Sequence, residues 1–192
     1  MDIALYGGSF DPPHIAHLEV IYQALQTLKI DQLFVLVAYQ NPFKKSPCFA
    51  PVQRLLWMQE LLKDLAKVKV HDFEIKQKRP VPSIESVRYF YQKFTPNKLY
   101  FLIGADNVAG LTLWEGYTEL KELVEFVVVE RKGYCLNPPS DFKYIPMSLE
   151  HITCPISSSK IRELLHKHQI PQHLPHMLQS RVLQTFKEIH AY

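Results

Sequence analysis

Apolar residues along this chain form two alternating kinds of segment. Short apolar segments of strand length occur at residues 3–6, 33–38, 68–75, 99–103 and 126–129. The segment at 33–38 has no polar alternation, which is typical of a strand buried on both faces of a sheet. After the first segment, apolar residues recur at helical spacing, at Leu18, Ile21, Tyr22, Leu25 and Leu28. The pattern therefore predicts a helix between the first two strands.

The same periodicity predicts further helices. One covers about residues 52–66, with an apolar face of Val52, Leu55, Leu56, Leu62 and Leu65, and another covers 84–94, with Ile84, Val87, Tyr91 and Phe94. The serines at 157–159 precede Ile161, Leu164 and Leu165, as in an N-capped helix, and a final helix covers 175–189. The proline-rich stretch 133–148 shows little periodicity, which predicts a long irregular loop.

Strands that alternate with helices favour an α/β fold. Because the strands are apolar on both faces, we expect a parallel sheet with helices on both sides, followed by a C-terminal helical segment. The chain has 192 residues and contains no internal repeat, low-complexity tract or linker. These features predict a single domain over residues 1–192.

Composition excludes several classes of protein. Hydrophobic residues make up 47% and charged residues 21% of the chain, which excludes a disordered, collagen-like or coiled-coil protein. No apolar run approaches the roughly 18 residues of a membrane span, so no membrane partner is expected. The N-terminus lacks the basic start and apolar stretch of a secretion signal. A net charge of +3 gives no reason to expect a nucleic-acid partner.

Cysteine usage bears on the cellular compartment. The three cysteines, Cys48, Cys135 and Cys154, are odd in number and far apart. They form no CxxC pair, which argues against a zinc knuckle or a disulfide framework. The sequence therefore predicts a cytoplasmic protein, and a homo-oligomer is left open.

The strongest chemical signal is the segment Gly7-Gly8-Ser9-Phe10-Asp11-Pro12-Pro13-His14-Ile15-Ala16-His17, between the first strand and the first helix. Ligands of open parallel sheets bind beyond the carboxyl ends of strands, and this junction is such an end. Two glycines allow close approach of the backbone to a ligand. The helix that follows offers free N–H groups suited to phosphate, and His14 and His17 lie on one face of it.

A second signal is Ile156-Ser157-Ser158-Ser159-Lys160-Ile161-Arg162. Hydroxyls and N–H groups at a helix start, with Lys160 and Arg162 nearby, can form a second oxyanion cradle. Taken alone, the first segment is also compatible with a plain turn bearing surface histidines, and the second with an ordinary serine cap. The first segment is not GxGxxG, and the chain has no GxxxxGK[ST] P-loop.

Together, these two segments resemble the H-x-G-H and I-S-S-T-x-x-R signatures of the nucleotidyltransferase superfamily. More narrowly, the chain is similar to the bacterial nicotinate-nucleotide adenylyltransferases. Further stretches agree with this resemblance in family order: Pro82-Ser83-Ile84, Gly104-Ala105-Asp106-Asn107, Leu113-Trp114-Glu115-Gly116-Tyr117 and Val129-Glu130-Arg131-Lys132-Gly133-Tyr134. The resemblance covers nearly the whole chain. It implies a Rossmann-like fold and transfer of AMP from ATP to nicotinate mononucleotide, with release of pyrophosphate.

The resemblance also implies roles for individual residues. The catalytic candidates, which contact the phosphates, are His14, His17, Lys44 and Arg162. The ATP-binding candidates are Gly7, Gly8, Ser9, Phe10, Gly104, Asp106, Arg131, Ile156, Ser157 and Ser158. The substrate-binding candidates at the pyridine are Ser83, Ile84, Glu85, Trp114 and Glu115, with Trp114 stacked on the ring. Mg²⁺ is expected on the ATP phosphates, with no metal site built by the protein.

This chain departs from the family pattern at four positions. Ala16 stands at a usual glycine, and Lys44 replaces a histidine in a phosphate-contacting loop. Glu85 replaces a threonine and Glu115 a tyrosine, and we expect both glutamate side chains to face solvent. Two alternatives are a pantetheine-phosphate or other small-nucleotide adenylyltransferase of the same fold, and a non-catalytic nucleotide-binding sensor. A fragment of a class I aminoacyl-tRNA synthetase is disfavoured, because the chain has no room for a tRNA-binding domain.

Overall fold

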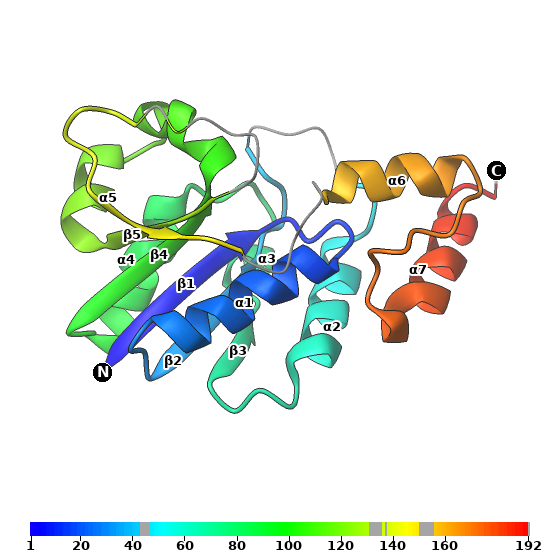
Figure 1. The fold of residues 1–192 in the computed structure, drawn as a ribbon, viewed down its shortest axis with the longest axis horizontal. Coiled ribbons are helices and arrows are strands. Elements are labelled where there is room, and N and C mark those ends of the chain that lie inside the picture. The colour runs from blue at the N-terminus through cyan, green and yellow to red at the C-terminus, as the bar shows by residue number, and fades with distance from the viewer. Residues whose placement is uncertain (43–46, 131–135, 137, 150–155, 192) are drawn as a thin grey trace.

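A six-stranded, fully parallel sheet organises the chain (Figure 1). The computed structural model describes residues 1–42, 47–130, 136, 138–149 and 156–191. The strand order is β3-β2-β1-β4-β5-β6. The strands are β1 (Asp2–Gly8), β2 (Gln32–Val37), β3 (Val68–His71), β4 (Lys98–Gly104), β5 (Glu125–Val129) and β6 (Tyr144–Met147). This confirms the predicted α/β, Rossmann-like fold.

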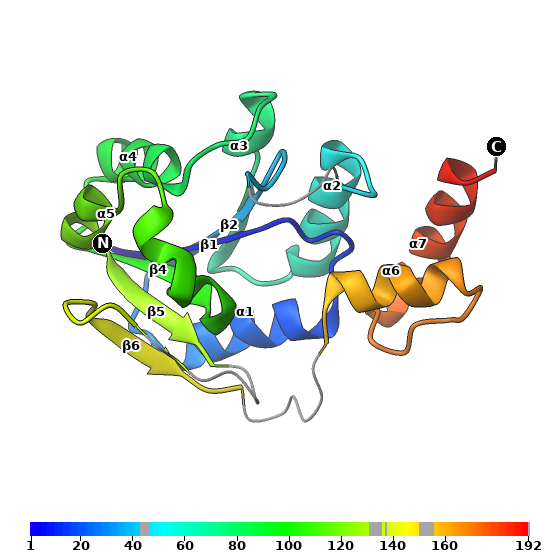
Figure 2. The same ribbon diagram turned by 90° about the horizontal axis from the view of Figure 1, so that it is seen from above.

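Helices lie between successive strands from β1 to β5 and cover both faces of the sheet, as the turned view shows (Figure 2). The helices of one face are α1 (Ile15–Thr27) and α2 (Pro51–Leu62). On the other face lie α4 (Ser83–Phe94), the 3₁₀ helix η1 (Ala105–Leu113) and α5 (Tyr117–Leu123). The short α3 (Phe73–Lys76) follows β3, and α6 (Ser158–His166) and α7 (His176–Ile189) end the chain.

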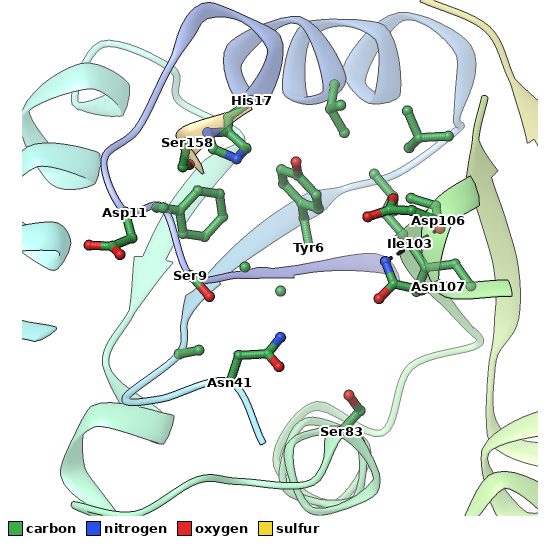
Figure 3. A pocket seen from close by; sticks show the side chains of 18 of the residues that line it. Tyr6, Ser9, Asp11, His17, Asn41, Ser83, Ile103, Asp106, Asn107 and Ser158 are labelled. Atoms are coloured by element: carbon green, nitrogen blue, oxygen red, sulfur yellow. Dashed lines mark hydrogen bonds between the residues drawn. The ribbon is translucent and has the colours of Figure 1, made fainter. Parts of the chain in front are cut away.

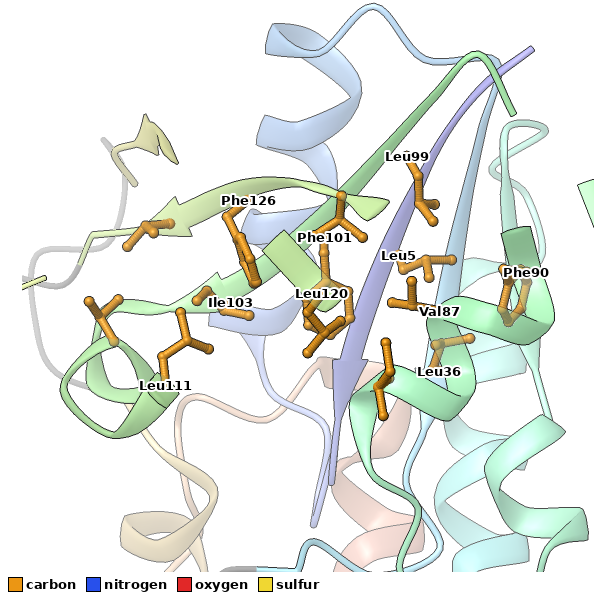
Figure 4. Packing of buried hydrophobic residues seen from close by; sticks show 14 of the residues in the cluster. Leu5, Leu36, Val87, Phe90, Leu99, Phe101, Ile103, Leu111, Leu120 and Phe126 are labelled. Atoms are coloured by element: carbon orange, nitrogen blue, oxygen red, sulfur yellow. The ribbon is translucent and has the colours of Figure 1, made fainter. Parts of the chain in front are cut away.

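Side chains alternate between the two faces along each strand. In β1, Ile3 and Leu5 pack under α4 and α5, whereas Ala4 and Tyr6 pack under α1 and α2. The α4 face is rich in aromatic and branched residues (Figure 4). A third buried cluster joins α6 and α7 to Phe49 and to Trp57 of α2. This cluster fixes α6 beside the start of α1.

Several sequence expectations need correction. The stretch 133–148 is not one irregular loop, because its end forms the edge strand β6, which accommodates Pro146 as edge strands can. The segment predicted as a strand over 68–75 turns after His71 into α3. The exposed side chains of Tyr22, Val52, Leu56 and Tyr91 do not belong to buried helix faces.

The exposed positions of α2 have an identifiable cause. Its buried face contains Arg54 as well as Trp57 and Met58, so the helix turns Val52 and Leu56 outward. A buried guanidinium needs acceptors, and it finds them in backbone carbonyl groups described below. Apolar spacing alone therefore indicates the helix but not its buried face. No helix in the described ranges is long and apolar enough to span a membrane.

The strand order places the functional segments. From β1, the chain continues to β2 and β3 on one side, and then crosses over to β4 on the other side of β1. The carboxyl ends of β1 and β4 therefore lie at the point where the direction of strand addition reverses. In open parallel sheets, this is where a crevice for ligands opens.

Candidate active site

A cleft of about 880 Å³ opens at the carboxyl ends of β1 and β4. Its floor includes Tyr6, Gly7 and Gly8 from β1 and Ile103 and Gly104 from β4. One end, here the α1–α6 end, is lined by His14, His17, Ser157, Ser158 and Arg162. The opposite end, here the α4 end, is lined by Glu74, Ser83, Trp114 and Glu115. Figure 3 shows Ser83 across the cleft from His17 and Ser158.

The two signature segments meet at the α1–α6 end, although almost the whole chain separates them. Ser158 Oγ donates to the carbonyl oxygen of Pro12 at 3.0 Å. Arg162 donates from Nη1 to the carbonyl oxygen and to Oδ2 of Asp11, the latter at 3.2 Å. Its Nη2 donates to Ser159 Oγ at 3.2 Å. The fold therefore brings together the hydroxyl, guanidinium and imidazole groups that the sequence only suggested as neighbours.

His14 and His17 form a stacked pair. Their ring centroids are 3.6 Å apart, and the rings are inclined by 21°. His14 is buried, with 1% of its surface exposed, and His17 is half-buried. His14 occupies the N-cap position of α1 with extended backbone, and its N–H donates to Nδ1 of His17 at 3.1 Å.

This bond determines where a neutral His17 ring carries its proton. A nitrogen that accepts a hydrogen bond has no proton of its own, so the proton lies on Nε2. His17 can then donate from Nε2 to an oxygen in the cleft.

The helix start itself differs from the expectation of free N–H groups. The N–H of Ile15, the first residue of α1, donates to the carbonyl oxygen of His173 at 3.1 Å. The loop before α7 thus already satisfies one of the groups expected to bind phosphate. The first N–H of α1 is therefore already bonded within the protein, and the side chains of His17 and Arg162 supply further N–H groups at this end of the cleft.

Phe10 supports the histidine pair rather than facing open space. It is 1% exposed, and its ring makes edge contacts with Tyr6 at 5.6 Å and with His17 at 4.9 Å. Its backbone has a φ of 49°, in the left-handed region that non-glycine residues rarely adopt. Buried packing on both sides holds this conformation, as is common where a functional loop is strained.

Three glycines bound the cleft for different spatial reasons. A Cβ at Gly8 would lie 2.8 Å from the Phe10 ring, and one at Gly104 would lie 2.3 Å from Oδ1 of Asp106. A Cβ at Gly7 would meet no described atom within 4 Å and would extend into open space. Gly8 is thus required by the buried ring of Phe10, whereas a side chain at Gly104 would displace the carboxylate of Asp106. Gly7 leaves room where its backbone faces the cleft.

A buried pair of charges frames the loops of the α1–α6 end. Arg54 is fully buried, and its guanidinium donates to the carbonyl oxygens of Ser9, Ala38, Tyr39 and Phe49. Asp11 is 5% exposed, and its two carboxylate oxygens accept the N–H groups of Cys48 and Phe49, each at 2.9 Å. Burial lowers the pKa of Arg54, and the nearby Asp11 opposes that shift.

The α4 end combines a helix start with an ion pair on its outer side. Ser83 begins α4 and lines the cleft. Arg79 donates from Nη1 and Nη2 to the two carboxylate oxygens of Glu85 at 2.9 and 2.6 Å. These bonds lower the pKa of Glu85 and keep it ionised. Trp114 lines the cleft while its ring makes an edge contact with Phe101 at 6.5 Å.

Glu74 is a buried carboxyl group in the wall of the α4 end. It lies in α3 with 8% of its surface exposed and accepts a hydrogen bond from Ser86 Oγ at 2.9 Å. Ser86 is itself 1% exposed and closes the first turn of α4. Burial raises the pKa of Glu74 to about 7, against the opposing effect of the Ser86 bond and with a further increase from Glu85.

Most of the predicted site residues line this one cleft: Gly7, Gly8, Ser9, Phe10, His14, His17, Ser83, Gly104, Asp106, Trp114, Glu115, Ser157, Ser158 and Arg162. Ile84, Glu85 and Ile156 are absent from the lining formed by the described residues. Ile84 is buried beneath Gly116, Glu85 turns to Arg79, and Ile156 packs in the cluster of α6 and α7. Lys44 and Arg131 lie outside the described residues.

The side chains of Glu85, Glu115 and Lys160 differ in how far they follow the sequence predictions. Glu85 faces away from the cleft, as expected. Glu115 is exposed but belongs to the rim of the cleft. Lys160 pairs with Glu163 at 3.0 Å and takes no part in the lining of the described cleft, in contrast to the expected cradle.

Sequence reasoning missed Asp11, Arg54 and Glu74 as site-forming residues. Asp11 stood inside the quoted motif, but nothing indicated that its carboxylate would bind two distant N–H groups and Arg162. Arg54 lies off the predicted apolar face of the helix over 52–66, and Glu74 lies within the segment predicted as a strand over 68–75. No local pattern singles these residues out, because the groups that they bind belong to other elements of the fold.

Most of the chain matches one family of known proteins. The cytidylyltransferase-like family matches residues 5–164. A Campylobacter jejuni protein named "Probable nicotinate-nucleotide adenylyltransferase" is 46% identical over 170 residues, which cover 88% of this chain and 90% of that protein. A Helicobacter pylori protein of the same name is 50% identical over 165 residues, covering 85% and 92%.

A solved structure is similar in fold. Plasmodium falciparum nicotinic acid mononucleotide adenylyltransferase, complexed with NaAD, superposes with a TM-score of 0.79 at 20% identity. The superposition covers 98% of this chain and 97% of the other. At this level of identity, the likeness concerns the fold.

Proposed function

Since this chain belongs to the cytidylyltransferase-like family, and within it to the nicotinate-nucleotide adenylyltransferases, we propose that it transfers AMP from ATP to nicotinate mononucleotide. The products are deamido-NAD and pyrophosphate. The observation that carries this proposal is the meeting of the two signature segments, Ser158 with Pro12 and Arg162 with Asp11, at the switch point of the sheet.

In the proposed reaction, a 5′-phosphate oxygen of nicotinate mononucleotide attacks the α-phosphorus of ATP in line. The bond from that phosphorus to the bridging oxygen breaks, and pyrophosphate leaves with the electron pair. The attacking oxygen is already ionised, so no protein base has to remove a proton. Catalysis then consists of positioning the two nucleotides and stabilising charge on the phosphate oxygens.

The α1–α6 end is suited to this task. His17 donates from Nε2 to an oxygen of the reacting phosphates, because the His14 N–H holds the proton on that nitrogen. Arg162 binds the triphosphate with its planar guanidinium, which first exchanges its contact with Asp11 for phosphate oxygens. Ser157 and Ser158 at the start of α6 add polar groups on the same side.

The α4 end then receives the pyridine. The start of α4 favours an anion, as helix N-termini do, and nicotinate mononucleotide carries a carboxylate on its ring. Glu85 does not oppose that carboxylate strongly, because Arg79 pairs with it outside the cleft. Trp114 presents a ring at the same end, where it can stack on the pyridine.

Mg²⁺ enters this proposal as part of the ATP substrate. Across the described ranges, no three His, Cys, Asp or Glu side chains are grouped so as to hold a metal ion. Phosphate oxygens are good ligands for Mg²⁺, so the ion would be held chiefly by ATP. We place the reaction in the cytoplasm, with no nucleic-acid or membrane partner.

A pyrophosphate-release assay with ATP and a set of acceptors tests the proposal. Nicotinate mononucleotide, its amide analogue and pantetheine phosphate are compared at equal concentrations. We expect release with the acid mononucleotide, at a rate at least about tenfold above the amide, equivalent to about 1.4 kcal/mol. Release with pantetheine phosphate alone would support a related adenylyltransferase. No release with any acceptor, despite ATP binding, would support a nucleotide sensor.

A further inference from the structure

Glu74 is a buried carboxyl group that the reaction described above does not use. It lines the cleft at the α4 end, and its only hydrogen-bond donor among the described side chains is Ser86, at 2.9 Å. Ser86 belongs to the same first turn of α4 as Ser83 and Glu85, where the proposed function places the pyridine carboxylate. The charge on Glu74 must therefore affect the binding of a ligand that carries a carboxylate at this end of the cleft.

We propose that Glu74 determines the preference for the acid substrate by its protonation: the protonated group accommodates the pyridine carboxylate, and the ionised group repels it. This inference rests on the proposed function. It follows from geometry, because two carboxylates at the end of one cleft, one of them buried, cannot both be ionised without a cost in binding free energy.

The direction of the effect can be derived. Burial raises the pKa of Glu74 to about 7. Below that pH, the free protein already carries the proton, and the acid binds without a proton change. Above it, Glu74 is ionised in the free protein, so binding of the acid either takes up a proton or brings two negative charges together. Affinity for the acid therefore falls as pH rises above about 7.

Other titratable and charged groups around Glu74 do not produce this pattern. At the end of β3, burial lowers the pKa of His71, so that ring loses its proton at lower pH. Within α3 and its N-cap, Asp72 and Lys76 pair with each other at 3.1 Å. On α4, Glu85 stays ionised through its bonds to Arg79. The amide analogue shares the ribose and phosphate of the acid, so the acid-to-amide ratio cancels titration of the phosphate and of groups around it.

Isothermal titration calorimetry provides the test. The dissociation constants of nicotinate mononucleotide and of its amide analogue are measured from about pH 6 to about pH 9, in buffers of different ionisation enthalpy. We expect the acid-to-amide affinity ratio to fall by about tenfold over this range, and binding of the acid at high pH to take up a proton. Binding of the amide should take up fewer protons than binding of the acid at the same pH, because groups that respond to the shared ribose and phosphate contribute equally to both.

Two variants make the assignment specific. Glu74→Gln keeps an acceptor for Ser86 but cannot ionise, so the ratio should become independent of pH and proton uptake should disappear. Ser86→Ala removes a bond that lowers the pKa of Glu74, so the fall in the ratio should move to higher pH. Glu60→Gln, at a partly exposed position of α2 away from this cleft, is a matched control that should behave like the parent.

The possible outcomes separate the inference from the proposed function. A ratio that does not change with pH in the parent, without proton uptake, overturns the role of Glu74, and so does an unchanged pH dependence in both Glu74→Gln and Ser86→Ala. If Glu74→Gln does not fold, Ser86→Ala still decides by the presence or absence of its shift. Failure of the proposed function would instead appear as no pyrophosphate release with ATP and either mononucleotide.

Discussion

The two ends of the cleft are held in place by different kinds of interaction. At the α1–α6 end, Arg54 and Asp11 are buried and bind backbone carbonyl and N–H groups of two connections, the one between β1 and α1 and the one between β2 and α2. At the α4 end, the start of one helix is held by the buried bond between Glu74 and Ser86 and by the exposed pair of Arg79 and Glu85. The loops of the α1–α6 end are therefore held by many buried bonds. At the α4 end, a change in the charge of one side chain can alter the binding of a ligand.

This difference matches the demands on each end. Stabilising charge on phosphate oxygens requires donors fixed in advance, since reorganisation during the reaction would raise the barrier. Selecting an acid over an amide requires only a difference in local charge. We therefore expect substitutions at the α1–α6 end to change turnover or folding, and those at the α4 end to change the choice of substrate.

The largest expected effect is on stability. Arg54→Ala removes a guanidinium that satisfies four carbonyl groups and faces Asp11, so it should lower the free energy of unfolding by about 3–5 kcal/mol. Arg54→Lys keeps the charge but loses the planar set of donors, so its free energy of unfolding should lie between those of the parent and Arg54→Ala. Urea denaturation of the three proteins measures this. Equal midpoints for the parent and Arg54→Ala would contradict the framing role of Arg54.

Loss of the fixed donor should reduce turnover. His17→Ala removes the imidazole that the His14 N–H orients, and we expect turnover to fall by about a hundredfold or more. Steady-state kinetics with saturating ATP and acid substrate measures this, with His176→Ala, at an exposed position of α7, as the matched control. Near-normal turnover with only a higher KM for ATP would show that His17 binds ATP without acting on the transition state.

A smaller effect is expected at the guanidinium of α6. Arg162→Lys retains a positive charge but cannot bridge two oxygens in one plane, so kcat/KM for ATP should fall by about tenfold. Arg181→Lys, on α7 and outside the lining of this cleft, serves as the control. The triphosphate role of Arg162 is rejected if the lysine variant matches the parent in both ATP binding and turnover.

The smallest effect concerns the exposed pair of the α4 end. Arg79→Ala leaves Glu85 ionised without its partner beside the first turn of α4, and should weaken acid binding by less than about 1 kcal/mol, since exposed ion pairs contribute little. The double variant Arg79→Ala/Glu85→Gln should recover the parent's affinity. Lys98→Ala breaks a comparable exposed pair at the other end of β4 and should change nothing. A larger loss in the double variant than in the single one would contradict this explanation.

The sequence predicts the α1–α6 end better than the α4 end. Paired glycines, paired histidines and a serine cap are local signals, because each can be recognised from a few consecutive residues. The parallel sheet can also be predicted from the sequence, since strands buried on both faces appear as apolar runs such as residues 33–38.

Other features depend on contacts between distant segments. Arg54 and Glu74 acquire their roles from partners that the fold supplies, namely carbonyl groups from two connections for Arg54 and a serine of α4 for Glu74. The edge strand β6 gives only a weak strand signal, because it has four residues and one of them is Pro146, which is unfavourable in most strands. Val52 and Leu56 are exposed instead of buried as predicted, because the helix buries Arg54, and apolar spacing does not reveal this.

The separation of the two ends can be tested in one measurement. The values of kcat/KM for nicotinate mononucleotide and for its amide analogue are determined with ATP in the parent and in His17→Ala. The account predicts a preference for the acid of at least about tenfold in both proteins, although both rates fall in the variant. Equal use of acid and amide by the parent would contradict the proposed substrate. A preference that disappears in His17→Ala would contradict the division of catalysis and selection between the two ends of the cleft.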